Sequence, residues 1–200
     1  MTQTTPIKFF LSALIVLNIV LLAAVSYLLL NRVPGGHLEA SRIDINDGTG
    51  HNRVVISNED LIPPPMLGGQ TFERVVNPAG LIFYDRNGNE RGGIAITDND
   101  ETNLHALAFD YDNADAVGIL AQDNKHDNYF RAGLMINDKR PSGKVGDNTS
   151  RIDLMTENGD AALVIKDPNE VPRIVLKVDS AGAPSIQLFD GNGEPTWQPQ

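Results

Sequence analysis

The chain has no cysteine and few aromatic residues, and its acidic residues outnumber lysine and arginine by 26 to 16. The absence of cysteine excludes disulfides, thiolate metal sites and cysteine nucleophiles. The formal net charge of −10 argues against binding to nucleic acid or tight docking on anionic lipid, because both need clustered positive charge. A basic or neutral protein is the more natural partner, and Trp197, the only tryptophan, is an expected partner-binding residue.

Charge is also absent from residues 9–30, which read FFLSALIVLNIVLLAAVSYLLL. As a helix this stretch spans roughly 33 Å, which matches the hydrocarbon core of a bilayer. A cleaved signal peptide is the alternative, but its apolar region has only about 7–15 residues before the cleavage site. We therefore expect a transmembrane helix at 9–30 in the lipid bilayer, a short tail at 1–8 and a flexible spacer at 31–40.

The flanking charges do not set the orientation of this helix, since Lys8 lies on one side and Arg32 and Arg42 lie on the other. Long domains are exported largely regardless of charge. We therefore expect an inner-membrane protein with a periplasmic or extracellular C-terminal domain. Asn18, in the middle of the helix, is an expected partner-binding residue, and its amide has two candidate partners: a helix of another membrane subunit or the local backbone.

After residue 40 no sustained helical period remains, and short apolar-alternating runs recur between Asp, Asn and Gly, a pattern typical of strands. These runs predict an all-β soluble domain over 41–200, large enough for a substantial core. The expected arrangement is an antiparallel meander, as a sandwich, a barrel or a stacked hairpin array, and a β-solenoid is the alternative. The runs are 42–46, 53–57, 80–84, 93–97, 104–109, 117–121, 132–136, 151–155, 162–166, 173–178 and 185–189.

The connectors between these runs share the pattern D-x-x-G, as at 47–50, 85–88, 179–182 and 190–193. In a type I turn, Asp at the first position caps backbone N–H groups and Gly at the fourth accepts a positive φ. The pattern therefore predicts tight hairpins. Two variants, Glu157-Asn-Gly159 and Asp167-Pro-Asn-Glu170, stand where further turns are expected.

The runs at 42–45 (RIDI) and 53–58 (RVVISN), followed by 80–93 (GLIFYDRNGNERGG), resemble a group of bacterial proteins with an N-terminal anchor and repeated turn–strand units. The resemblance covers most of the chain after residue 40. It implies a bacterial origin and an exported β-rich domain, and it carries no activity and no catalytic residues.

The segment from Asn58 to Asn77 interrupts the rhythm of strands. It contains Pro63, Pro64 and Pro65, which are locked in an extended form and cannot donate hydrogen bonds to a sheet. Two interpretations stay open for this segment: a plain surface loop, or an arm that docks a partner protein.

The strongest candidate for a chemical site is a group of acidic residues with DxD spacing: Asp98, Asp100, Asp110, Asp112 and Asp115. Calcium prefers six to eight oxygen ligands, so a calcium site formed by these loops is a hypothesis. Neither run continues as an EF-hand, and solvated turn residues are the alternative. No pair among the four histidines has metal-ligand spacing, and no other cofactor is expected.

No nucleophile elbow, phosphate loop or other catalytic motif is present in the sequence. We therefore expect a non-catalytic, membrane-anchored accessory subunit that contacts other integral membrane proteins of a bacterial complex, with respiratory and photosynthetic complexes among the candidate hosts. A ligand-binding module of the envelope, which captures a carbohydrate or peptide, is the first alternative. A hydrolase with an unrecognised site is the second.

Overall fold

The computed structural model describes residues 5–30, 36–99, 103–124 and 126–197, and the chain divides into two compact units, Met1–Ala40 and Ser41–Gln200. The first unit contains helix α1 (Thr5–Leu30), whose described side chains are exposed. Its segment Lys8–Tyr27 is long and apolar enough to cross a membrane. The predicted apolar helix is therefore present, and it begins a turn earlier than expected.

The second unit is built from strands that are connected mostly by tight turns. These are β1 (Arg42–Asn46), β2 (Asn52–Ser57), β3 (Met66–Leu67), β4 (Gln70–Thr71), β5 (Ala79–Tyr84), β6 (Glu90–Asp98), β7 (Asn103–Asp110), β8 (Asp115–Asn124), β9 (Tyr129–Lys139), β10 (Asn148–Glu157), β11 (Asp160–Lys166), β12 (Pro172–Val178), β13 (Pro184–Phe189) and β14 (Pro195–Trp197).

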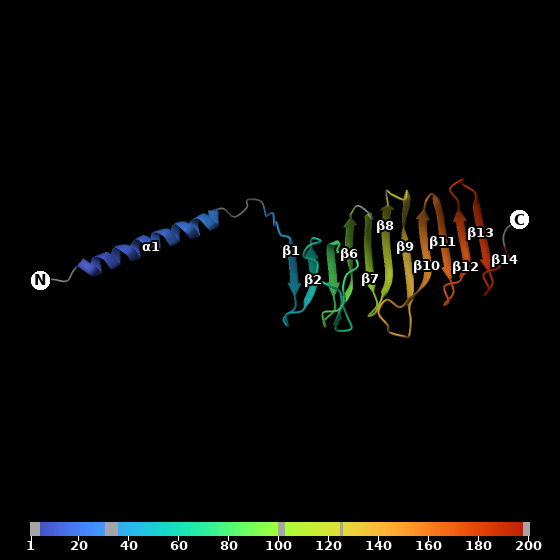
Figure 1. Ribbon diagram of the computed structural model, residues 1–200, viewed down its shortest axis with the longest axis horizontal. Coiled ribbons are helices and arrows are strands. Elements are labelled where there is room, and N and C mark those ends of the chain that lie inside the picture. Colours follow the sequence, from blue (N-terminus) through green and yellow to red (C-terminus); the bar gives the residue numbers. More distant parts are fainter. Residues whose placement is uncertain (1–4, 31–35, 100–102, 125, 198–200) are drawn as a thin grey trace. The chain divides into compact units, whose positions relative to one another are not determined.

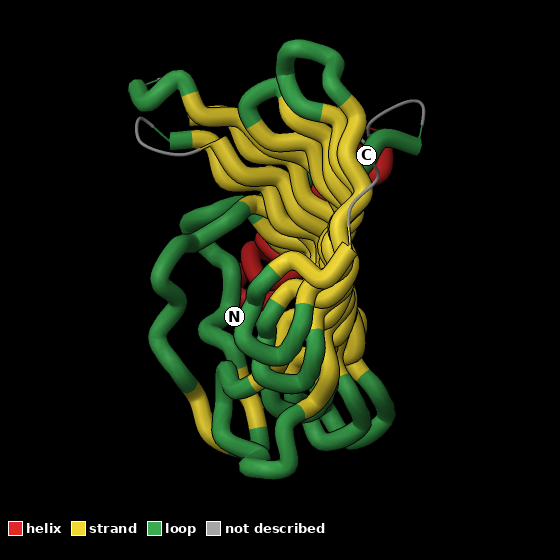
Figure 2. Tube along the Cα trace, turned by 90° about the vertical axis from the view of Figure 1, so that its right-hand side faces the viewer, coloured by secondary structure: helices red, strands yellow, loops and turns green. Residues whose placement is uncertain are grey.

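Among the described residues, twelve strands form one antiparallel sheet in chain order (Figure 1). This is the predicted meander. The short β3–β4 hairpin, which follows β2 and precedes β5 in the chain, lies outside this sheet. Within the described residues β14 does not pair with β1 and no second large sheet is present, so the sheet is open and is neither a barrel nor a sandwich. Figure 2 looks along the sheet and shows a single layer with the usual strand twist.

The D-x-x-G turns form as the sequence predicts. At 179–182 the Gly182 N–H donates to the Asp179 carbonyl at 2.9 Å, and Asp179 Oδ1 accepts from the N–H groups of Ala181 and Ala183. Gly182 has a φ of 86°, a conformation that glycine adopts without steric cost. The same capping recurs at Asp47, Asp85, Asp167 and Asp190. The hairpins at these five aspartates are therefore stabilised by hydrogen bonds within the turn itself.

The apolar core is small, which corrects the expectation of a substantial core. Within the described residues, the buried large apolar side chains are Val55, Ile82, Tyr84 and Leu120, and Ile62 packs against the first three. The chain exposes 14198 Å², whereas a compact monomer of 21.7 kDa exposes about 9,200 Å². The excess comes from the exposed helix and from sheet faces that a single layer leaves uncovered.

Candidate functional site

The predicted acidic group is divided between the two ends of strand β7. Asp98 ends β6 and pairs with Asn103 at the start of β7, whereas Asp110 ends β7. A strand of 8 residues is about 25 Å long, so Asp98 and Asp110 cannot bind one ion. Asp100 lies outside the described residues. The hypothesis of one site that joins both loops is therefore not supported by this geometry.

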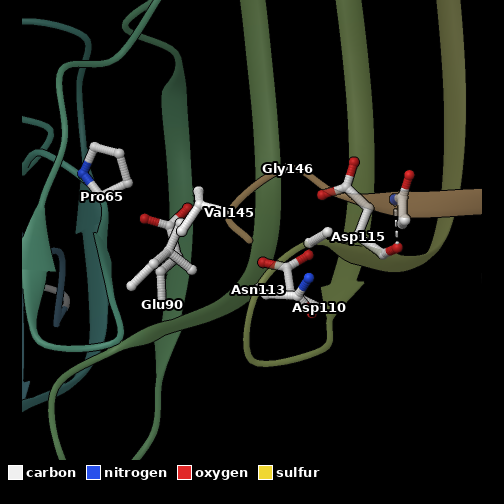
Figure 3. Close-up of a pocket in the computed structure, with 10 residues that line it drawn as sticks. Pro65, Glu90, Asp110, Asn113, Asp115, Val145 and Gly146 are labelled. Atoms are coloured by element: carbon white, nitrogen blue, oxygen red, sulfur yellow. Dashed lines mark hydrogen bonds between the residues drawn. The ribbon is translucent and has the colours of Figure 1, made fainter. Parts of the chain in front are cut away.

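Three carboxylates line one cavity of about 340 Å³ at the other end of β7: Glu90, Asp110 and Asp115 (Figure 3). Asn113, in the turn between β7 and β8, donates from Nδ2 to the carbonyls of Lys144 and Asp147, both at 3.0 Å. These bonds hold the β9–β10 loop over the cavity. The cavity is thus a fixed part of the fold.

Burial and negative neighbours change the acidity of this cavity. Burial, followed by the charges of Asp115 and Glu90, raises the pKa of Asp110 to about 7. The negative charge of Asp115 beside Asp110 favours the protonated form of Asp110. Asp112 differs, because it is exposed and forms an ion pair with Lys139 that lowers its pKa.

A bound metal would need several of these ligands to converge on one point. Within the part of the chain that the structure describes, no group of three or more His, Asp or Glu side chains is arranged to hold a metal ion. The calcium hypothesis therefore rests on the sequence alone. What the cavity shows is a half-buried Asp110, with its pKa raised to about 7, beside the exposed Asp115.

The proline-rich segment does not extend away from the domain. Pro63 and Pro65 are half-buried while Pro64 is exposed, and Arg74 Nε donates to the Pro63 carbonyl at 2.8 Å. Arg74 also pairs with Glu90 at 2.5 Å between side chains that are less than 15% exposed. The segment therefore covers one face of the sheet near β2 and β5, and Pro64 keeps an exposed side chain.

The two remaining expected contact residues have different surroundings. Asn18 Nδ2 donates to the backbone carbonyl of Leu14 at 2.8 Å, so its amide has a partner within α1. Trp197 is 50% exposed at the end of the sheet, opposite Leu188 on β13. The tryptophan therefore belongs to a larger surface, which the register of the strands defines.

One face of the sheet carries a continuous row of large aliphatic side chains. Residues that are directly opposite each other in neighbouring strands share a face, and the register joins one Leu or Ile from each of β1, β2 and β5–β13. The row is Ile43, Ile56, Leu81, Ile94, Leu107, Ile119, Leu134, Leu154, Leu163, Leu176 and Ile186.

A second apolar row runs beside the first, two residues along each strand. On β6 its position is Gly92, and the rings of Phe83 and Phe109 on either side stack with centroids 6.0 Å apart. We call the two rows together the apolar face. The second row is Ile45, Val54, Phe83, Gly92, Phe109, Val117, Ile136, Ile152, Ile165, Ile174, Leu188 and Trp197.

The opposite face, which we call the mixed face, carries small residues, the buried core and ion pairs. Lys166 pairs with Asp153 at 2.6 Å and Lys177 pairs with Asp160 at 2.5 Å. The apolar face has no charged residue in either row, and its side chains at Ile119 and Leu154 are 55% and 52% exposed. Exposed apolar surface of this extent is unusual for a water-soluble domain.

Sequence reasoning predicted eleven of the twelve strands in these rows, all except β14, but it missed the surface, because alternation within each strand does not show which residues of different strands align. The available signal was the turn chemistry, since a hairpin of fixed length fixes the register of its two strands. Comparison with known proteins adds nothing to this geometry, because no family model, curated protein or solved structure matches the chain.

Proposed function

We propose that the chain is a non-catalytic structural protein, anchored in the inner membrane by α1, which uses its sheet to contact other subunits of a bacterial membrane complex. The observation that carries the proposal is the apolar face, which is wide, free of charge and uncovered in the described chain. A water-soluble domain does not keep such a surface exposed without a partner. The sheet domain lies on the periplasmic side in this proposal.

The membrane part of the proposal is supported by Lys8–Tyr27, whose mean hydropathy is 2.6 and whose side chains have no cover within the chain. Because the Asn18 amide is already bonded to its own helix, the anchor is able to stay in lipid without a polar partner. The docking role is therefore assigned to the sheet and not to the helix.

The test has two stages, applied to the full chain in native membranes. Washing with high salt and alkali should leave the protein in the membrane fraction, whereas a control with Leu17→Arg in the middle of α1 should move to the aqueous wash. Mild detergent extraction followed by native electrophoresis should then place the wild-type chain in an assembly well above 21.7 kDa. Recovery in the wash, or migration as a lone chain, would contradict the proposal.

A further inference from the structure

The proposed function leaves open what covers the apolar face. We propose that the cover is the apolar face of another copy of this chain, so that sheets of neighbouring copies pack face to face in a homo-oligomer. This inference deepens the proposed function and rests on it, because it names the partner of the same surface.

The length and spacing of the two rows favour a second copy as the cover. Strands lie about 4.8 Å apart, so the Leu and Ile row, with one residue from each of eleven strands, is roughly 50 Å long. The two rows lie about 7 Å apart along the strands. A second copy presents ridges of the same pitch and length, and two sheets pack at about 10 Å with interdigitated side chains. Few other surfaces match a ridge pattern that is uniform over this distance.

The area of the apolar face is also sufficient for a contact between two copies. A strip roughly 50 Å long and 15–20 Å wide covers on the order of 800–1,000 Å² on each copy. Stable protein–protein interfaces bury about 800 Å² on each partner. Pairing the apolar faces of two copies therefore supplies the area that a stable dimer needs.

The positions of the charged groups also favour this contact. Two chains of net charge −10 repel each other unless their charged groups face away from the contact. The ion pairs of Lys166 and Lys177 lie on the mixed face, and the capping aspartates lie in the turns. Face-to-face packing through the apolar rows keeps these charges in water.

The edge strands disfavour the other common way in which sheets associate, which is pairing of their edges. The edge strand β14 has 3 residues and begins with Pro195, which has no N–H to donate. The other edge, β1, carries the ion pair of Arg42 and Asp44 at 2.7 Å. Both features are typical of edges that resist strand addition. The face, and not the edge, is the surface left for contact.

The experiment uses the absence of cysteine from the chain. Single cysteines are placed on the apolar face at Ile94 and Leu154, and each is matched by its neighbour in the same strand on the mixed face, Ala95 and Met155. Native membranes that contain each variant, or mixtures of two variants with different tags, are treated with a bismaleimide that spans roughly 10–15 Å. Denaturing gels then report the size and tags of each product.

We expect Ile94→Cys and Leu154→Cys to give dimer-sized products when each is present alone and products that carry both tags when they are mixed. Both should exceed the products of Ala95→Cys and Met155→Cys at least tenfold. One thiol in each chain limits the cross-linked product to a dimer, so a dimer band that carries both tags supports the inference. Equal products from both faces, no product from either, or products that contain only a different protein would overturn it.

The failure of this inference is distinguishable from the failure of the proposed function. A cross-link from the apolar face to a different membrane protein leaves the proposed function intact and removes only the homo-oligomer. Release of the chain into the alkaline wash removes the membrane-anchored function, whatever the cross-links show. Circular dichroism checks the strand content of each variant, so a misfolded variant is recognised before its cross-links are interpreted.

Discussion

The same strands form both faces of this sheet, but the two faces differ in how far their apolar side chains are exposed. Leu120, on the mixed face, is 8% exposed, while its neighbour Ile119, on the apolar face, is 55% exposed. On the mixed face, charged groups form ion pairs and many side chains are small. The proline-rich segment covers part of this face. The side chains of the apolar face are exposed within the described chain, and in our proposal they serve a contact with another molecule.

The largest expected effect is on association. In the Ile94→Cys background, adding Ile119→Lys and Leu154→Lys should lower the cross-linked fraction at least tenfold, because two charges would be buried without partners in the contact. The same pair of changes on the mixed face, Met135→Lys and Met155→Lys, should leave it within about twofold. An equal loss from both pairs would mean that the faces do not differ in function.

The next effect concerns two glycines in neighbouring regions of the sheet. Gly92 has a φ of 118°, and a Cβ there would lie 2.1 Å from the Ala108 carbonyl oxygen, whereas a Cβ at Gly118 would meet its nearest atom at 3.7 Å. We therefore expect Gly92→Ala to lower the free energy of unfolding by about 3 kcal/mol and Gly118→Ala to change it by less than about 0.5 kcal/mol. Thermal or urea unfolding of both variants, followed by circular dichroism, measures the difference.

A smaller effect should separate the ion pairs of the mixed face. Asp153 and Lys166 are each 20% exposed, whereas Asp160 and Lys177 are 37% and 38% exposed. Asp153→Ala should therefore cost about 1–2 kcal/mol, because it leaves Lys166 partly buried without its partner, and Asp160→Ala should cost less, because its pair is more exposed to water. Urea unfolding at low and high salt gives both values, and a larger cost for Asp160→Ala would contradict the burial argument.

The smallest effect is a dependence on pH at the acidic cavity. The pKa of Asp110 is raised to about 7 from 3.8, so the folded state binds its proton more tightly than the unfolded state. Its contribution to stability is complete below pH 3.8 and is lost as pH rises through 7. Asp110→Asn should therefore raise stability by about 1 kcal/mol at pH 8 and change it little at pH 5.

The control for this prediction is Asp112→Asn. Its carboxylate is exposed and its pKa is lowered by Lys139, so no gain is expected at pH 8. Melting temperatures of both variants across pH 5–8 are sufficient to decide. A gain from Asp110→Asn that is equal at both pH values would show that its charge is not the cause.

The local features of the fold were predictable from the sequence. Asp179 and Gly182 form the turn that their spacing predicts, and the apolar alternation of each run marks its strand. The division of the acidic group was also within reach, because the predicted strand at 104–109 already separates Asp98 from Asp110. Strand length alone places their carboxylates far apart.

The apolar face and the small core were not predictable from the same patterns. Alternation shows that Leu107 and Leu134 are apolar, but only their register with Ile119 on β8 places them in one row. Farther along the sheet, a bulge between Ser150 and Ile152 shifts the register of β10 with β9. An alternating pattern is also the same whether a face is covered by a second sheet of the same chain or by another molecule. The sequence therefore could not distinguish a sandwich from an open single layer.

Strand order follows chain order throughout this sheet, and this order affects how the length of the sheet can change. Each strand contacts only its immediate neighbours, so a hairpin inserted or removed at one of the D-x-x-G turns would leave the remaining pairings intact. The rows of the apolar face would grow or shrink by the same number of strands. The number of hairpins therefore sets the length of the sheet and of its apolar rows.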